Sequence, residues 1–416
     1  MVIFMKYYFV GIKGSGMSGL ALIIKNLGND VRGADVEHEL FTQCQLIENG
    51  IIIDSLSNMH YEDYDIIVLG NAFIDKFDFN DKKTITYQEL LSSIVNKYFS
   101  IAICGSHGKT TTTNMIKHVL SHKYDIGYLV GDGQGFMSKN AKYFVFEACE
   151  HRDHFLSYHP NVIICTNIDY DHVEYFKNKK QYVESFMKFF NNSKDELILN
   201  QNISYYKKCQ TYGTFKANVY ASNIKYKLDG TYFNLIINKT KYKNLYLPFF
   251  GKYQLEDALA CISCCLYLNM NLNEILTYLS SYTQATRRHN VMIYNSNVII
   301  DDYGHHPSEI KATIAAIKQE FKKKKLIIVY HPDREKRLTT FLNDYKNAFK
   351  KAKTTYVLPF LNNTEESIKA INKLVDNRKI LNFNDNFYKR YSNHIFLFTG
   401  SKDMNEQINK LKKYLM

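Results

Sequence analysis

The sequence predicts an α/β protein of three domains. Strand-like apolar segments alternate with helical stretches in three successive blocks, and this alternation is typical of parallel sheets covered by helices. A chain of 416 residues is also too long for one ordinary core. We expect domains at residues 1–97, 98–290 and 291–416.

The first block predicts a Rossmann-like N-terminal domain. It opens with a strand at Tyr7–Ile12, a helical stretch ends near Gly28, and a second strand ends at Asp35. The turn after the first strand consists of Gly14, Ser15, Gly16, Met17, Ser18 and Gly19. This turn also suits NAD, with Asp35 as the ribose-binding acid about 20 residues further on. An NAD-dependent oxidoreductase is therefore one alternative.

The second block predicts a P-loop-type ATPase domain with a mainly parallel sheet. A strand at Ser100–Cys104 and a helical run at Thr112–His122 flank a phosphate-binding loop. The loop residues are Gly105, Ser106, His107, Gly108, Lys109, Thr110 and Thr111. Glycines let backbone N–H groups approach phosphates, and the helix N-terminus offers partial positive charge. We expect Lys109 to reach the terminal phosphates of ATP and Thr110 to bind magnesium.

Two polar positions follow the next strands of this block. Glu147 ends the strand at Tyr143–Glu147, and His172 follows the strand at Asn161–Thr166. Doubly wound sheets bind ligands at these strand ends, so both side chains are expected to converge on the loop. Together with Thr110 they could hold magnesium ions that bridge ATP and a second substrate.

The third block predicts a Rossmann-like C-terminal domain. Its strands are expected at Asn297–Asp302, Leu326–Tyr330 and Ile395–Phe398, and a helix at Ser308–Lys323. A net charge of +12 comes from scattered lysines, so we do not expect nucleic-acid binding. No apolar run approaches the roughly 20 residues of a membrane span.

The eight cysteines do not form a disulfide framework. They lie far apart, and no secretory leader precedes the first strand, so we expect a reducing, cytoplasmic location. Cys261 and Cys264 have metal-like spacing, but no second pair completes a zinc site. We expect these thiols to pack as small apolar groups on a helix.

The chain resembles the Mur ligase family over nearly its whole length. The short phosphate loop, Glu147 and the Asn167–His172 segment match in order. Further motifs select the members that couple L-alanine to UDP-N-acetylmuramic acid. They are Gly11–Ser18, Arg287-Arg288 and Asp301-Asp302-Tyr303-Gly304-His305-His306-Pro307.

The resemblance implies a role for each matching residue. Those implied for catalysis are Lys109, Arg288, His305 and Arg337. The residues implied to bind ATP are the loop residues 105–111 with Asp257 and Asp302. The implied metal ligands are Thr110, Glu147 and His172. Those implied for the two other substrates are Gly14, Ser15, Gly16, Met17, Ser18, Asp35, Tyr303, His305, Arg334 and Arg337.

The implied reaction forms an amide bond with ATP and two magnesium ions. The γ-phosphoryl group would pass to the lactyl carboxylate, and L-alanine would attack the acyl phosphate. The resemblance implies a monomer or homodimer. The alternatives are a recycling ligase that attaches a tripeptide to the same nucleotide, the oxidoreductase named above, and a nucleotide-binding regulator without catalysis.

Five features depart from the family pattern, and one of them is the segment Tyr330-His331-Pro332-Asp333-Arg334, which varies Phe-Gln-Pro-His. Cys149-Glu150-His151-Arg152 replaces Asp-Glu-Ser-Asp, which leaves Glu147 intact. Tyr253 and Asp257 stand where a histidine and an asparagine usually lie near the adenine. The segment Gly400-Ser401-Lys402-Asp403 alters a Gly-Ala-Gly-Asp pattern. We expect this last change, and His289 after the paired arginines, to lie away from the core chemistry.

Overall fold

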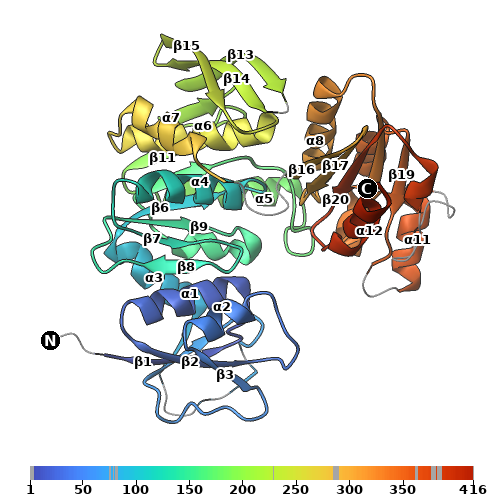
Figure 1. Cartoon of the computed structure of the whole chain (residues 1–416). Coiled ribbons are helices and arrows are strands. Elements are labelled where there is room, and N and C mark those ends of the chain that lie inside the picture. Colours follow the sequence, from blue (N-terminus) through green and yellow to red (C-terminus); the bar gives the residue numbers. More distant parts are fainter. Residues whose placement is uncertain are drawn as a thin grey trace.

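The computed structural model describes residues 4–74, 76–77, 79, 83–227, 229–283, 290–360, 364–375, 381 and 387–415. It contains three sheets with helices packed against them (Figure 1). The N-terminal domain lies below the central domain in this view, and the C-terminal domain lies beside it. The predicted three-domain α/β class is confirmed, and the boundaries at 97/98 and 290/291 stay a prediction. Arg287, Arg288 and His289 lie outside the described residues.

The N-terminal sheet is parallel, with strand order β3-β2-β1-β4-β5. Its strands are β1 (Lys6–Val10), β2 (Asp30–Asp35), β3 (Ile52–Ser55), β4 (Ile66–Leu69) and β5 (Lys83–Thr86). Its helices are α1 (Ser15–Asn26), α2 (Gln43–Glu48) and α3 (Tyr87–Lys97). The predicted Rossmann-like domain is confirmed. The first strand ends at Val10, before the predicted Ile12, because Gly11 takes a φ of +82° and turns the chain.

The central sheet has ten strands in the order β15-β14-β13-β12-β11-β10-β6-β9-β7-β8. Its first six strands along the chain are β6 (Phe99–Cys104), β7 (Ile126–Leu129), β8 (Gly135–Met137), β9 (Tyr143–Glu147), β10 (Val162–Cys165) and β11 (Glu196–Asn200). The others are β12 (Gln210–Gly213), β13 (Val219–Lys227), β14 (Gly230–Ile237) and β15 (Thr240–Leu247). Strands β7, β9, β6, β10, β11 and β12 run parallel, as predicted. Strands β13, β14 and β15 form an antiparallel extension, which the sequence did not predict.

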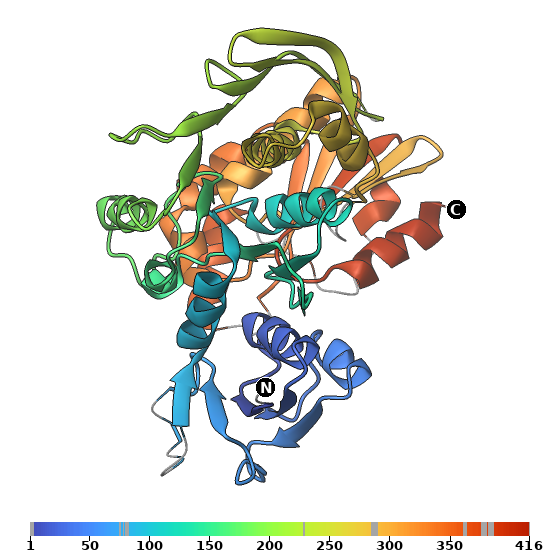
Figure 2. The same ribbon diagram turned by 90° about the vertical axis from the view of Figure 1, so that its left-hand side faces the viewer.

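The helices of the central domain cover the parallel strands (Figure 2). They are α4 (Lys109–Ser121), α5 (Lys179–Phe190), α6 (Lys252–Tyr267) and α7 (Leu272–Ser280), with the short 3-10 helix η1 (His151–Ser157). Helix α6 contains no proline or glycine and buries Cys261, Cys264 and Cys265 completely in an apolar cluster. The prediction that these thiols pack as apolar groups is confirmed.

The C-terminal sheet has the order β16-β17-β20-β18-β19, and only β16 is antiparallel to its neighbour. Its strands are β16 (Asn290–Tyr294), β17 (Asn297–Asp302), β18 (Lys325–Tyr330), β19 (Thr354–Val357) and β20 (His394–Thr399). Its helices are α8 (Pro307–Glu320), α9 (Glu335–Thr340), α10 (Leu342–Phe349), α11 (Glu365–Leu374) and α12 (Asn405–Leu415). The predicted Rossmann-like architecture is confirmed. Helix α8 ends at Glu320, three residues before the predicted Lys323.

The N-terminal domain contacts the central domain through α1 and β8. Gly19 and Gly135 bring the two backbones together so closely that a Cβ on Gly135 would lie 1.9 Å from the Gly19 carbonyl oxygen. Beside this crossing, Gln45 Nε2 donates to the Gly133 carbonyl oxygen at 2.7 Å. The two glycines therefore set the distance between the domains. None of the described helices combines the length and apolar composition that a bilayer span requires.

Candidate active site between the three domains

The phosphate loop is held by the segment that follows β10. The Ser106 N–H donates to the Asn167 carbonyl oxygen at 3.2 Å, and the His107 N–H donates to Asn167 Oδ1 at 3.0 Å. Gly105 has a φ of +132°, and a Cβ there would lie 2.1 Å from Thr166 Oγ1. Both the backbone conformation and the available space therefore require glycine at this position.

Helix α4 begins at Lys109 with no side chain capping its N-terminus. Its N-cap residue, Gly108, has a φ of +80° and offers no acceptor to the first N–H groups. Open N–H donors at the positive end of a helix favour a bound phosphate. The structure thus gives the predicted loop, including Thr110 and Thr111, the geometry that phosphate binding needs.

Glu150 is the partner of both Lys109 and His172, although the sequence did not single it out as a site residue. Lys109 Nζ lies 3.0 Å from Glu150 Oε2, and His172 Nε2 lies 3.4 Å from Glu150 Oε1. Burial alone would raise the pKa of Glu150, but Lys109 and His172 outweigh it and lower this pKa to about 2. The available signal was an acid three residues after Glu147, inside the segment that departs from the family pattern.

The predicted magnesium ligands lie on two sides of Lys109. Glu147 accepts hydrogen bonds from the Gly131 N–H, at 2.7 Å, and from Thr110, whereas His172 lies on the side of the C-terminal domain. Burial raises the pKa of Glu147, although the Gly131 N–H and Lys109 act in the opposite direction. A divalent cation would offset this cost of burying a carboxylate. The carboxylate of Glu147 and the hydroxyl of Thr110 are oxygen ligands of the kind that magnesium prefers. His172 would add a nitrogen ligand, and all three ligand roles stay a prediction.

A cavity of about 620 Å³ separates the N-terminal domain from the central domain. Its wall includes five predicted substrate residues, namely Gly14, Ser15, Gly16, Met17 and Asp35. Lys109 and Glu147 lie on the opposite wall. The glycine-rich turn of the first domain therefore faces the phosphate loop of the second across one continuous space.

Asp35 and Ser18 also hold the backbone around this cavity. The Asp35 carboxylate accepts from the N–H groups of Lys13 and Val36 at 2.6 and 2.7 Å. Ser18 is completely buried, and its hydroxyl bonds to the Gly133 carbonyl oxygen at 3.3 Å. The structure thus places Ser18 in the contact between domains, away from the cavity wall where the sequence predicted it.

The residues predicted to bind the nucleoside of ATP surround a much smaller cavity of about 80 Å³. Its wall includes His107, Gly108, Thr111, Tyr253, Asp257 and Asp302. Asp257 accepts a hydrogen bond from Thr112 at 3.1 Å, and Asp302 accepts one from Thr313 at 2.8 Å. The volume corresponds to only a few water molecules.

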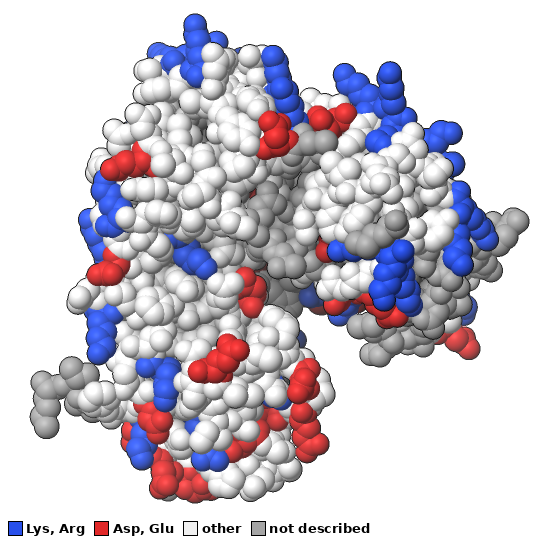
Figure 3. Space-filling view, in the orientation of Figure 1, with Lys and Arg blue, Asp and Glu red and all other residues white. Residues whose placement is uncertain are grey.

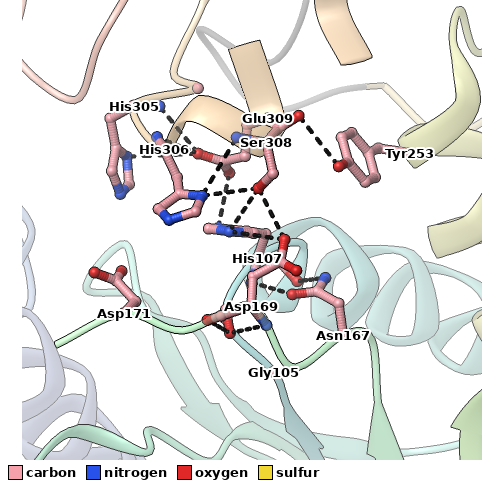
Figure 4. A network of polar contacts seen from close by, with 12 residues as sticks. Gly105, His107, Asn167, Asp169, Asp171, Tyr253, His305, His306, Ser308 and Glu309 are labelled. Carbon is pink, nitrogen blue, oxygen red and sulfur yellow. Dashed lines mark hydrogen bonds and ion pairs between the residues drawn. The ribbon is translucent and has the colours of Figure 1, made fainter. Parts of the chain in front are cut away.

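A polar network closes the C-terminal domain onto the phosphate loop (Figure 4). His107 Nδ1 lies 3.3 Å from Glu309 Oε1 of helix α8, and the Ser308 hydroxyl donates to Asp169 at 2.8 Å. Burial alone would lower the pKa of His107 and raise that of Glu309. Their mutual attraction reverses both effects, so the pKa of His107 is raised and that of Glu309 is held well below its usual range. Burial lowers the pKa of neighbouring His306 to about 4.

A second large cavity, of about 430 Å³, lies between the phosphate loop and the C-terminal domain. Its wall brings together several predicted site residues, namely Ser106, His107, Gly108, Lys109, Thr110, His172, Tyr303, His305, Arg334 and Arg337. Lys109 therefore lines both large cavities. The sequence predicted this convergence, apart from Arg288, which lies outside the described residues.

The two predicted arginines of this cavity are engaged in ion pairs. Arg337 is buried and lies 3.0 Å from Asp171 and 2.8 Å from Asp333. Arg334 lies 2.8 Å from Glu174. Asp171 and Glu174 belong to the central domain, so both arginines connect the two domains. Arg337 in particular has carboxylates on two sides.

Lys402 also lines this cavity, so the expectation that its segment lies away from the core chemistry is wrong. The chain turns sharply at Gly400, which has a φ of +141° and packs against the His331 backbone. The turn brings Ser401 and Lys402 over the cavity that contains Lys109. The sequence shows the altered motif, but the position of the turn relative to the loop depends on domain packing.

The fold and site define a three-domain α/β protein built around one phosphate-binding loop, and profiles of one family match almost all of it. The Mur ligase middle domain matches residues 103–265, the Mur ligase family catalytic domain residues 6–96, and the Mur ligase glutamate ligase domain residues 287–394. The chain belongs to the Mur ligase family, whose members are ADP-forming ligases that use ATP and magnesium.

Solved structures show the same fold. UDP-N-acetylmuramate-alanine ligase MurC from Thermotoga maritima is 24% identical, with 99% of each chain covered and a TM-score of 0.80. A murein peptide ligase from Psychrobacter arcticus is 19% identical, with 99% of this chain and 98% of that chain covered and a TM-score of 0.68. MurF ligase from Thermotoga maritima in complex with ADP is 16% identical, with 92% and 94% covered and a TM-score of 0.66.

Proposed function

We propose that this ligase couples L-alanine to the lactyl carboxylate of UDP-N-acetylmuramic acid in peptidoglycan precursor synthesis. The observation that carries the proposal is the position of Lys109, which lines both large cavities. A carboxylate from the first cavity and an amine from the second could meet at the phosphate held there. The nucleotide-sized first cavity and the similarity to the Thermotoga maritima alanine ligase support these substrates.

The phosphate loop would perform the activation step. Lys109 and the open N-terminus of α4 would bind the γ-phosphate and stabilise the charge that develops during phosphoryl transfer. Thr110, Glu147 and His172 would hold two magnesium ions, which neutralise phosphate charge when bound. Glu150 would orient Lys109 and His172 through the ion pairs described above. Asp257 and Asp302 would contact the nucleoside of ATP.

The two substrates would occupy opposite sides of the loop. The turn at residues 14–17 and Asp35 would bind the uridine nucleotide, and Tyr303 and His305 would position L-alanine. Burial lowers the pKa of His305 although Glu309 acts to raise it, so its imidazole is neutral at pH 7 and able to accept a proton. Arg334 and Arg337 would complete this side by fixing the C-terminal domain against the central one. By resemblance, Arg288 would lie near the transferred phosphate.

Closure of the C-terminal domain would protect the acyl phosphate from water. The polar network between His107, Asp169, Ser308 and Glu309 shows that this domain already contacts the loop. Exclusion of water leaves the amine as the available nucleophile. The protein would act in the cytoplasm as a monomer or homodimer, with domains at 1–97, 98–290 and 291–416.

A recycling ligase that attaches a tripeptide is the second candidate, supported by the similar fold of the murein peptide ligase. The oxidoreductase explains the turn at residues 14–19 but gives no role to Lys109, Glu147 and His172. A nucleotide-binding regulator without catalysis would not need Lys109, Glu147 and His172 around one phosphate loop.

The test is phosphate release from MgATP by the purified protein. UDP-N-acetylmuramic acid would be supplied with L-alanine, with the tripeptide in its place, and with each substrate omitted. We expect turnover only when the nucleotide and L-alanine are both present. Dependence on the tripeptide would transfer the proposal to the recycling reaction, and an absence of turnover with either amine would contradict it.

A further inference from the structure

We infer that Lys402 binds the α-carboxylate of the incoming amino acid. The inference deepens the proposed function and rests on it, because it assigns the amine substrate to the cavity that Lys402 lines. It names a specificity-determining residue that distinguishes an amino acid from a simple amine.

The charges on the cavity wall distinguish Lys402 from the other basic residues there. Its lysine and arginine residues are Lys109, Arg334, Arg337 and Lys402. The first three have carboxylate partners at 3.0, 2.8 and 2.8 Å, respectively. In the part of the chain that the structure describes, Lys402 has no ion-pair partner within 4.0 Å. Among the lysines and arginines of this wall, Lys402 is therefore the one without a carboxylate partner among the described residues, so its charge can bind a ligand.

The backbone that carries Lys402 is held by contacts on both sides. On one side, Gly400 packs so tightly that a Cβ there would lie 2.3 Å from the His331 carbonyl oxygen. On the other side, Asp403 Oδ1 accepts from the Asn405 N–H at 2.8 Å at the start of α12. The segment is thus fixed on both sides. A fixed backbone keeps the ammonium group within reach of this cavity, and no ordering of the segment is needed on binding.

The position of Lys402 on the wall favours a carboxylate over a phosphate as its ligand. In the proposed function, Lys109 and the uncapped N-terminus of α4 would bind the phosphate from the side of the central domain. Lys402 approaches from the C-terminal domain, on the wall that also includes Tyr303 and His305. An amino acid that enters this cavity loses water around its carboxylate, and an ammonium group compensates for that loss through a charge-assisted hydrogen bond. The Lys402 ammonium group would contribute much less to the binding of an uncharged amide.

The experiment compares L-alanine with L-alaninamide, which lacks the carboxylate, in the full-length protein with MgATP and UDP-N-acetylmuramic acid. We expect Lys402→Met to raise the KM for L-alanine about 10- to 100-fold and to leave the KM for ATP unchanged. The wild-type preference for L-alanine over L-alaninamide should disappear in this variant. Lys402→Arg should keep most of the preference, and Lys413→Met, an equal charge change on the exposed side of α12, should have no effect.

The outcomes separate this inference from the proposed function. If the wild-type protein turns over L-alanine and Lys402→Met keeps the same KM for it, the inference is wrong and the proposed function stands. A rise in the KM for ATP alone would assign Lys402 to the phosphate and overturn the carboxylate assignment. If the wild-type protein does not use L-alanine at all, the proposed function fails, and the inference fails with it.

Discussion

The two large cavities that meet at Lys109 are bounded by different kinds of contact. On the side of the N-terminal domain, the domains meet through glycine backbones and uncharged hydrogen bonds, such as that between Gln45 and Gly133. On the side of the C-terminal domain, they meet through ion pairs, such as His107 with Glu309 and Arg337 with Asp171. Close backbone packing therefore positions the N-terminal domain, and ion pairs position the C-terminal domain. We expect only the second contact to respond strongly to pH.

The surface shows lysine and arginine side chains spread over all three domains, with acidic side chains among them on the N-terminal domain (Figure 3). This agrees with the scattered charge seen in the sequence. The charged contacts that matter for the site are the buried ones between domains, because exposed pairs contribute little to stability.

The largest expected effect comes from Lys109, where the two regions meet. Lys109→Ala should lower phosphate release about 10³-fold, because it removes the cation that stabilises the transferred phosphoryl group. The variant also leaves buried Glu150 without its closest partner, which should cost about 3 kcal/mol of unfolding free energy. Phosphate assays and thermal unfolding measure the two effects.

The double variant Lys109→Ala with Glu150→Gln provides the control. It removes the unpaired carboxylate and should recover most of the lost stability without recovering activity. Activity of either variant within tenfold of wild type would contradict the phosphate role of Lys109.

A substitution of Arg337 tests the ion-paired contact between the central and C-terminal domains. Arg337→Met should lower the free energy of unfolding by about 3 kcal/mol, because it leaves Asp171 and Asp333 buried without their shared partner. It should also raise the KM for the amine more than the KM for the uridine nucleotide. Asp171→Asn is the matched milder change, since Arg337 keeps Asp333. Equal rises in both KM values would show that the contact with the C-terminal domain does not act on the amine site in particular.

A substitution of Gly135 tests the close backbone contact between the N-terminal and central domains. Gly135→Ala places a methyl group against the Gly19 backbone, so the domains must separate, at a cost of about 2 kcal/mol. We expect the KM for the uridine nucleotide to rise about tenfold while the KM for the amine changes little. Ser18→Ala removes one hydrogen bond of the same contact and should act in the same direction by about 1 kcal/mol. A larger rise in the KM for the amine than in the KM for the uridine nucleotide would contradict the assignment of this contact to the nucleotide side.

The smallest expected effect is the pH dependence of the His107–Glu309 pair. The pKa of His107 is raised, so its contribution is complete below about pH 6.5 and is lost as the pH rises through the raised value. The pKa of Glu309 is lowered, so its contribution is complete above about pH 4.3 and is lost as the pH falls through the lowered value. The pair should therefore stabilise most between about pH 4.3 and 6.5.

Thermal unfolding of wild type and His107→Gln across pH measures this effect. The difference in Tm should be largest near pH 5.5 and smaller at alkaline pH. A difference that stays constant across the range would show that the pair does not carry the pH dependence. Gly135→Ala, in contrast, should shift the Tm by a similar amount at each pH in this range.

The sequence was informative where the site depends on local order. A strand, a glycine-rich loop and a helix follow one another along the chain, so the loop from Gly105 to Thr111 could be predicted from spacing. The positions of Glu147 and His172 followed from the rule that parallel strands present their ends at one edge. The helix of Cys261 and Cys264 followed from an apolar run without proline or glycine.

The sequence was less informative where the site depends on contacts between domains. Glu150 pairs with Lys109 across 41 positions, and Arg337 pairs with Asp171 across 166, so no local spacing indicates either pair. The sequence predicted a turn at residues 14–19, but helix α1 already begins at Ser15. Ser18 therefore lies in this helix, and it faces the neighbouring domain because the helix packs on β8. The altered segment at Lys402 was visible, but only the packing of the third domain places it beside the loop.

If a carboxylate is activated as an acyl phosphate at Lys109, one of its oxygen atoms must pass to the released phosphate. The measurement uses UDP-N-acetylmuramic acid labelled with ¹⁸O in the lactyl carboxylate, together with MgATP and L-alanine. Attack of the amine on the acyl phosphate leaves one carboxylate oxygen on the released phosphate. We predict phosphate that carries one ¹⁸O per turnover, and phosphate free of the label would contradict the account.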